Sequence, residues 1–300
     1  MGDYTLSGRE ILVTHEAAKS VLGPTLLVAI EQNYPENERI ISDHLAVSML
    51  PFSMKALVWF TQFSSLRNRL VKTIEKTAPG VWGGLLCRKR YIDEKLFKLD
   101  HRTEAIINLG AGFDTRLYHM PKSAPIPAWE IDQSVNIAQK EKHVVRLLGQ
   151  IPKHIQLLPV DFERDDLGSV LSANGYSSEQ QTFFIWEAVS QFLTESGIQA
   201  TLSFLSKAKQ GSRLAFTYIL KEFLIGDNLY GQEKSYKQFV EKGVWLSGLH
   251  PEDVPGFLEP YGWNVLEHLG YDELAEKYVK PTGRILFALP IERLVLAAKN

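Results

Sequence analysis

The 300-residue sequence has very little of what marks several other protein classes. Its single cysteine, Cys87, excludes an intrachain disulfide framework and a cysteine-rich metal site, and we expect no bound metal. So few thiols suit a reducing compartment. The longest apolar stretches, such as residues 25–30 and 56–60, are far too short to span a bilayer. Nothing in this composition predicts a disulfide scaffold or a membrane-spanning protein.

The sequence also has no large excess of positive or negative charge. The 33 Lys and Arg residues nearly balance the 35 Asp and Glu residues, and no polybasic block predicts a nucleic-acid surface. Residues 1–10 are polar and charged, without the apolar segment of a secretory signal. We therefore expect a cytoplasmic protein whose partner is a small molecule rather than a nucleic acid or a membrane. The oligomeric state is left open.

The sequence of residues 1–103 predicts helices and no strands. Helical patterns cover residues 17–30, with a break expected at Pro24, and residues 40–50, 54–74 and 85–99. We expect this region to form a lid over the ligand-binding edge of the domain, and residues 221–260 to form a second lid element.

Short, continuously apolar segments begin at Ala105 and alternate with helical ones. Strands are predicted at residues 105–109, 129–132, 155–160, 182–186, 212–219, 263–268 and 284–298, and helices at 135–148 and 195–208. This alternation predicts an α/β fold with a Rossmann-like, mostly parallel seven-stranded sheet and helices on both faces. The whole chain is expected to be one domain, with a ligand-binding core at 104–220 and C-terminal strands at 261–300.

A glycine turn follows the first predicted strand. Gly110, Ala111 and Gly112 would let the backbone turn tightly and approach a ligand closely. The dinucleotide pattern GxGxxG is absent, since Thr115 and Arg116 follow, and this counts against NAD or FAD. Taken alone, the turn is also compatible with a plain connection between strand and helix.

Two further strand ends carry carboxylates suited to a nucleoside. Asp132 can accept hydrogen bonds from both ribose hydroxyls, a feature common to NAD and S-adenosylmethionine. Asp161 can accept from an adenine amine, while Phe162 adds an apolar side chain and a backbone N–H. The alternatives are an exposed strand-end carboxylate at Asp132 and a helix N-cap at Asp161.

The end of the fourth predicted strand carries a negative charge, and one predicted helix carries a positive charge. Glu187 directly follows an apolar strand, and a buried carboxylate there is costly unless it is paired. An ammonium or sulfonium group would supply the opposite charge. Arg88 lies close to an apolar helix face and could clamp a carboxylate, although a solvated arginine is the ordinary interpretation.

These residues together resemble the leucine carboxyl methyltransferase family, in particular its bacterial small-molecule O-methyltransferases, over nearly the whole chain. Residues 108–116 resemble its "NLGAGFDTR" loop, residues 88–93 its "RTRFFD" segment, and residues 130–132 its "ExD". Asp161-Phe162 is similar to its "DL", Glu187-Ala188-Val189 to its "EGV", and residues 248–254 to its "GLxPEDV". Phe162 and Ala188 replace the family's leucine and glycine, and its basic residue in the first helix is missing.

The resemblance implies a class I fold dependent on S-adenosylmethionine. In the family, the arginine that corresponds to Arg88 of this sequence holds the carboxylate of the cofactor. The implied cofactor residues are the following: Arg88, Gly110, Ala111, Gly112, Asp132, Asp161, Phe162 and Glu187.

The implied reaction is methyl transfer, by in-line displacement, to a carboxyl or hydroxyl oxygen of a small molecule, in the manner of secondary metabolism. Tyr218 and His250 are our candidates for lining the acceptor pocket, and no catalytic base is assigned. The alternatives are an NAD-dependent oxidoreductase and a relative that binds S-adenosylmethionine without methylating.

Overall fold

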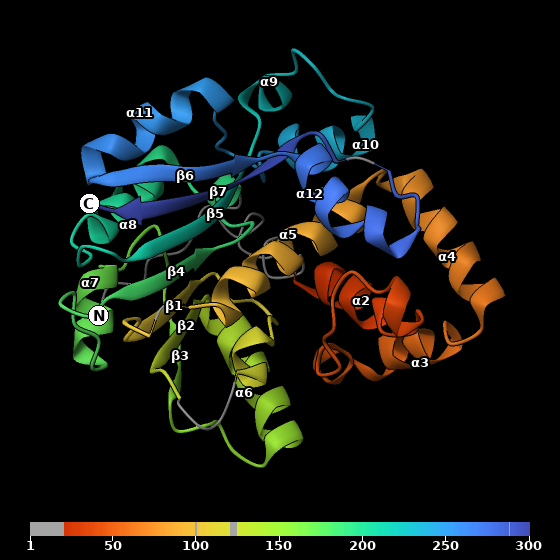
Figure 1. The fold of residues 1–300 in the computed structure, drawn as a ribbon, viewed down its shortest axis with the longest axis horizontal. Helices are drawn as coiled ribbons and strands as arrows, with labels where there is room; N and C mark the ends of the chain where they lie inside the picture. Colours follow the sequence, from red (N-terminus) through yellow and green to blue (C-terminus); the bar gives the residue numbers. More distant parts are fainter. Residues whose placement is uncertain (1–20, 100, 121–124, 288) are drawn as a thin grey trace, which may run out of the picture.

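A single seven-stranded sheet runs through the molecule (Figure 1). The computed structural model describes residues 21–99, 101–120, 125–287 and 289–300. The strands are β1 (Ala105–Leu109), β2 (Ala128–Asp132), β3 (Ile155–Pro159), β4 (Thr182–Trp186), β5 (Arg213–Ile219), β6 (Trp263–Leu269) and β7 (Glu292–Lys299). Their spatial order is β3-β2-β1-β4-β5-β7-β6, with β7 antiparallel to both of its neighbours and the other pairings parallel. This confirms the mostly parallel α/β sheet predicted from the sequence.

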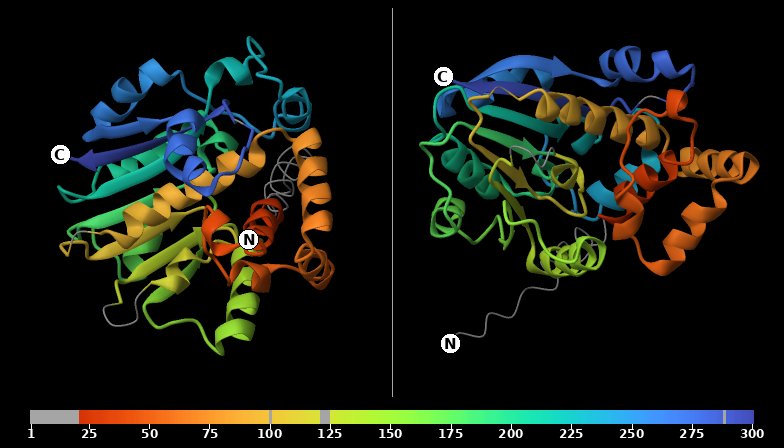
Figure 2. Two further views of the ribbon diagram at one scale, coloured as in Figure 1. Left: turned by 45° about the vertical axis from the view of Figure 1, so that its right-hand side comes forward. Right: turned by 60° about the horizontal axis from the view of Figure 1, so that its bottom comes forward.

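Helices cover both faces of the sheet (Figure 2). They are α2 (Leu22–Glu31), α3 (Phe52–Phe60), α4 (Ser64–Thr77), α5 (Val81–Phe97), α6 (Ser134–Leu148), α7 (Leu167–Ala173), α8 (Glu195–Leu205), α9 (Lys221–Leu224), α10 (Glu233–Ser235), α11 (Val254–Leu258) and α12 (Tyr271–Tyr278). Helices α7, α8 and α11 bury apolar residues against one face, and α2, α5 and α12 against the other. Alternate side chains of β1 point to the two faces of the sheet. Ile107 packs on the side of α7, α8 and α11, and Ile106 packs on the side of α2, α5 and α12. The strands are continuously apolar because both of their faces are covered.

Two predicted helices differ from the structure for local reasons. Residues 40–50 form a loop ending in a short 3₁₀ turn, Ala46–Met49, because the Asp43 side chain accepts hydrogen bonds from the Leu45 and Ala46 backbone N–H groups. The predicted helix 54–74 is two helices. The chain leaves the helical path at Thr61, where Arg67 donates to the Thr61 carbonyl.

Two other boundaries also differ. The expected break at Pro24 is absent, because proline is tolerated in the first turn of α2, where backbone N–H groups have no helical partner. Residues 17–20 of that predicted helix lie outside the described residues. The last strand begins only at Glu292, and residues 284–287 and 289–291, which were also expected in it, belong to no strand.

The strand directions decide which residues share one edge of the sheet. Strands β1, β4 and β5 end at the same edge, and β7 begins there because it runs the opposite way, so that Ile219 pairs with Glu292. In Figure 2, α2 and α4 lie beside this edge, whereas α5 begins near it and runs on over one face of the sheet. No helix among the described residues is both long and apolar enough to cross a membrane.

The glycine turn after β1 allows a direct test. Gly110 has φ +76°, and a Cβ there would lie 2.2 Å from Cγ2 of Val189, whereas Gly149 has φ +82° and open space around it. We expect Gly149→Ala to cost about 1–2 kcal/mol, from the left-handed backbone alone. Gly110→Ala should cost about 1–3 kcal/mol more through overpacking. Urea unfolding of both variants checks this, and equal losses would contradict the steric argument.

Candidate active site

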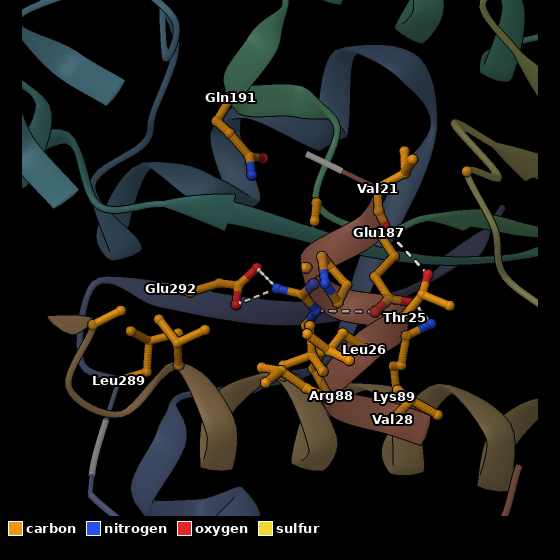
Figure 3. A pocket seen from close by; sticks show the side chains of 18 of the residues that line it. Val21, Thr25, Leu26, Val28, Arg88, Lys89, Glu187, Gln191, Leu289 and Glu292 are labelled. Carbon is orange, nitrogen blue, oxygen red and sulfur yellow. Dashed lines mark hydrogen bonds and ion pairs between the residues drawn. The ribbon is translucent and has the colours of Figure 1, made fainter. Parts of the chain in front are cut away.

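One cavity of about 600 Å³ opens along this edge of the sheet, a volume typical of small-ligand sites. Its walls come from α2, the end of α4, α5, the segments that follow β1 and β4, the end of β5, the chain around α10 and the start of β7. Figure 3 shows charged side chains meeting in the middle of this cavity. The sheet and the helical N-terminal region therefore enclose the site together.

Five of the predicted cofactor residues line the cavity, namely Arg88, Gly110, Ala111, Gly112 and Glu187. Gly110 and Gly112 have φ values of +76° and +44°, so the turn uses the left-handed backbone region that glycine adopts without strain. Asn108, at the end of β1, also lines the cavity, and its buried Nδ2 has no hydrogen-bond partner. The turn thus places backbone groups and one unpartnered amide toward a ligand.

The other three predicted cofactor residues are absent from the cavity lining. Asp132 is buried behind the turn, where it accepts hydrogen bonds from the Gly112 N–H at 2.6 Å and from Asn136 Nδ2 at 2.7 Å. Burial raises the pKa of its carboxyl. Asp161 is half-exposed and accepts from the Glu163 N–H, and Phe162 packs in the apolar core. Their contact with ribose and adenine stays a prediction.

The two predicted acceptor residues are absent from the lining of this cavity, and their contact with an acceptor stays a prediction. Tyr218 packs in the apolar core beside Phe216, and its hydroxyl shares a 2.8 Å hydrogen bond with His268 Nε2. Side chains alternate across a strand, and it is the next residue, Ile219, that lines the cavity. His250 precedes the short 3₁₀ turn Pro251–Asp253 and does not reach the lining.

The Arg88 guanidinium lies between two carboxylates (Figure 3). Its Nε donates to Glu187 Oε1 at 2.9 Å, and its Nη1 donates to both oxygens of Glu292 at 2.6 and 2.7 Å. The three side chains are only 7–11% exposed. Such charge-assisted bonds are stronger than neutral ones, and they hold the guanidinium in one orientation.

Glu187 receives two more cations. Arg116 Nη2 donates to its Oε2 at 2.5 Å, and Lys89 Nζ lies 3.7 Å from the same oxygen. Burial by itself would raise the pKa of this carboxyl, but the three cations outweigh it and lower the pKa to about 2. Glu187 therefore stays ionised at any working pH.

A second acidic group shares the same cations. Asp114 lies 2.7 Å from Arg116 Nε and 3.4 Å from Lys89 Nζ, and despite its burial these charges hold its pKa well below the usual range. Asp93 behaves differently, because burial outweighs Arg116 and raises its pKa to about 6. Two arginines, one lysine and several carboxylates thus form one connected, water-poor network.

Sequence reasoning missed Lys89, Asp114, Arg116 and Glu292. The first three lie in segments that resemble the family, so the sequence could have indicated them. Only the glycine turn and Arg88 of those segments were assigned to the cofactor. Glu292 offered no signal, because it lies within a predicted strand and its position depends on the direction of β7. Ala188 has φ +57° and lines the cavity, so replacement of the family's glycine has left a strained residue there.

Replacing Arg116 tests the network. Arg116→Gln would leave Asp114 and Glu187 with too few cations, and we expect it to cost about 3–5 kcal/mol of unfolding free energy, the usual loss when a buried pair is broken. Lys209→Gln serves as the control. Its 3.0 Å bridge to Glu104 is nearly half-exposed, and little change is expected. Similar losses in the two variants would show that the network does not carry stability.

The pair formed by His119 and Asp43 predicts a pH dependence. The His119 side chain is only 17% exposed, and its Nε2 lies 2.8 Å from Oδ1 of Asp43, a residue of the cavity wall. Burial disfavours the charged ring, yet the hydrogen bond with Asp43 outweighs it and raises the pKa of His119 above 6.5.

The stabilisation from the charged ring is fully present below pH 6.5 and is lost as pH rises through the raised pKa. The difference in unfolding free energy between wild type and His119→Gln should therefore shrink as the pH rises above 6.5. Chemical unfolding over a pH series measures this, and a difference that stays constant would rule the ionised pair out.

Comparison with known proteins identifies related chains. The model of the family described as leucine carboxyl methyltransferase matches residues 21–206. A protein of Mycolicibacterium paratuberculosis named "Putative S-adenosyl-L-methionine-dependent methyltransferase" is 31% identical over 198 residues, which cover 61% of each chain. Relatives with the same name occur in Mycobacterium avium, at 29% identity over 43% of this chain and 42% of that one, and in Mycobacterium tuberculosis H37Rv, at 25% identity over 74% and 67%. The chain thus spans about half the length of the first two of these curated relatives.

Solved structures share the fold at low identity. A Thermobifida fusca "putative methyltransferase" aligns with a TM-score of 0.57 at 13% identity, over 78% of this chain and 88% of that one. A DUF574-family protein of Streptomyces avermitilis aligns with a TM-score of 0.53 at 13% identity, over 76% and 88%. At such identities the likeness supports the sheet and its helices, and nothing finer.

Proposed function

Since the chain belongs to the leucine carboxyl methyltransferase family, we propose that it is an S-adenosylmethionine-dependent O-methyltransferase acting on a carboxyl or hydroxyl oxygen of a small molecule. The observation that carries this proposal is the meeting of the glycine turn, Arg88 and Glu187 at one cavity. The names of the mycobacterial relatives support the cofactor assignment. A role in secondary metabolism and a cytoplasmic location are parts of the same proposal.

The residues present suit the amino-acid end of this cofactor. Arg88 would hold the carboxylate, with the guanidinium already oriented by its two glutamates. Glu187 and Asp114 supply ionised carboxylates for the ammonium group, and the unpartnered Asn108 amide faces the same space. The nucleoside end would continue past Gly112 toward Asp132, which has further lone pairs to offer.

When bound, S-adenosylmethionine supplies a methyl group on a positively charged sulfur. The chain's own task is to hold an acceptor oxygen in line with the bond that breaks, and such positioning can contribute about 7–11 kcal/mol in ideal cases. The enclosing residues of α2 and α5, together with residues 234–245, would exclude water from the reacting groups. We propose the described residues of the predicted first lid, 21–99 and 101–103, and the second lid, residues 221–260, as the elements that do so; residues 1–20 and 100 of the first lid lie outside the described residues.

Calorimetry on two variants tests the site assignment. Arg88→Ala and Asp132→Ala should each weaken the binding of S-adenosylhomocysteine by about 1–3 kcal/mol, the scale of one charge-assisted hydrogen bond. Glu179→Ala, an exposed position outside the cavity, is the control and should bind as wild type does. Unchanged affinity in both site variants, with melting temperatures showing that they fold, would refute the assignment.

Ligand choice separates this proposal from its alternatives. Thermal stabilisation by S-adenosylmethionine and S-adenosylhomocysteine, and none by NAD, is expected because the GxGxxG turn is missing. Stabilisation by NAD alone would favour an oxidoreductase. Transfer of a labelled methyl group to an acceptor would exclude a relative that binds the cofactor without methylating.

A further inference from the structure

The order of the strands divides the cavity into two halves. The glycine turn follows β1, Glu187 follows β4, Ile219 ends β5 and Glu292 begins β7, and these strands are neighbours in that order. Arg88 lies between Glu187 and Glu292 (Figure 3). If the cofactor occupies the half beside the glycine turn, as the proposed function requires, the half beside Glu292 is left for the acceptor.

The acceptor half contains one carboxylate, Glu292, beside the amide of Gln191, which can both donate and accept a hydrogen bond. Both oxygens of Glu292 bind the single Nη1 atom of Arg88, which leaves lone pairs free on each. Gln191 is 4% exposed, lines the cavity and has a buried Oε1 without a partner. In Figure 3 the amide nitrogen of Gln191, rather than its oxygen, lies on the side toward Glu292. The two Glu292 oxygens are therefore suited to a ligand that donates a hydrogen, and the Gln191 N–H groups can donate to the same ligand oxygen.

The cations of the cavity are already assigned, so none is left to pair with an acceptor carboxylate. Arg88 is held by two glutamates and is the residue proposed for the cofactor carboxylate, Lys89 lies against Asp114 and Glu187, and Lys234 is an exposed residue that donates to a backbone carbonyl. These three are the lysines and arginines that line the cavity among the described residues. A ligand carboxylate beside Glu292 would therefore add an unpaired buried charge, which is costly.

The remaining walls of the half are mostly apolar, formed by Ile219, Phe239, Trp245, Leu289 and Ile291, and Trp245 adds a buried Nε1–H donor without a partner. The rings of Phe239 and Trp245 are stacked, with centroids 4.7 Å apart. Flat apolar surfaces of this kind suit an aromatic or other rigid apolar body.

We infer that Glu292 selects, as the methyl acceptor, an uncharged apolar molecule that presents a hydroxyl group, and that it excludes a carboxylate. The inference rests on the proposed function and narrows it. The acceptor hydroxyl donates its hydrogen bond to the Glu292 carboxylate, opposite the Gln191 amide. As the oxygen bonds to the methyl carbon, the sulfur keeps the electron pair of the broken C–S bond, and the hydroxyl proton passes to Glu292.

The test compares two probes that differ only in the reacting group, 1-naphthol and 1-naphthoate. Calorimetry on the protein saturated with S-adenosylhomocysteine should show naphthol binding at least about tenfold more tightly, the size of one lost buried hydrogen bond. Glu292→Gln removes the negative charge and adds an N–H donor, so it should bring the two affinities to within about threefold. The exposed Glu179→Gln variant should keep the wild-type preference.

Methyl transfer from labelled S-adenosylmethionine should follow the same order, with naphthol methylated by wild type and naphthoate not. Tighter binding of naphthoate by wild type, the same preference in Glu292→Gln as in wild type, or no binding of either probe at millimolar concentration would overturn the inference. Loss of S-adenosylhomocysteine binding in wild type would instead overturn the proposed function. The melting temperature of Glu292→Gln, and its affinity for S-adenosylhomocysteine, show whether that variant is folded.

Discussion

The pairing of one buried carboxylate, Glu187, with three cations holds the site together. Removing such a charge from water costs several kcal/mol, which only close partners can offset. Its partners are Arg88 and Lys89 on α5 and Arg116 just after the glycine turn. Arg88 in turn binds Glu292 at the start of β7. The need to neutralise one carboxylate thus joins a helix, two strand ends and a third strand around a common space.

This arrangement also gives the two halves of the cavity different chemistry. On one side the glycine turn brings backbone groups and the Asn108 amide close to a ligand. On the other side apolar walls surround the carboxylate of Glu292 and the amide of Gln191. Arg88 belongs to both halves, since its two glutamates lie on either side of it. A charged amino-acid group and an apolar acceptor can therefore bind next to one another.

The helical N-terminal region is tied to the sheet by polar contacts as well as by apolar packing. Asp43 binds Thr115 and His119 beside the glycine turn. Glu31 is fully buried and accepts hydrogen bonds from Trp82 Nε1 at 3.2 Å and Arg284 Nη1 at 2.6 Å, which joins α2 to α5 and to the segment before β7. Such contacts give the enclosure of the cavity a defined geometry.

The sequence by itself determined the strands, their parallel sheet and the residues at strand ends, because continuous apolar runs and glycine turns are local signals. The glycine turn and Glu187 were predictable for that reason, whereas the role of Arg88 came from the family resemblance. Tyr218 packs in the apolar core because side chains alternate along β5, and Asp161 is a half-exposed turn residue. Glu292 reaches the site only because β7 runs antiparallel to β5, and the charge network forms only when α5 crosses that edge. The antiparallel direction of β7 and the side-chain pairing are long-range properties, so the tertiary structure alone decided them.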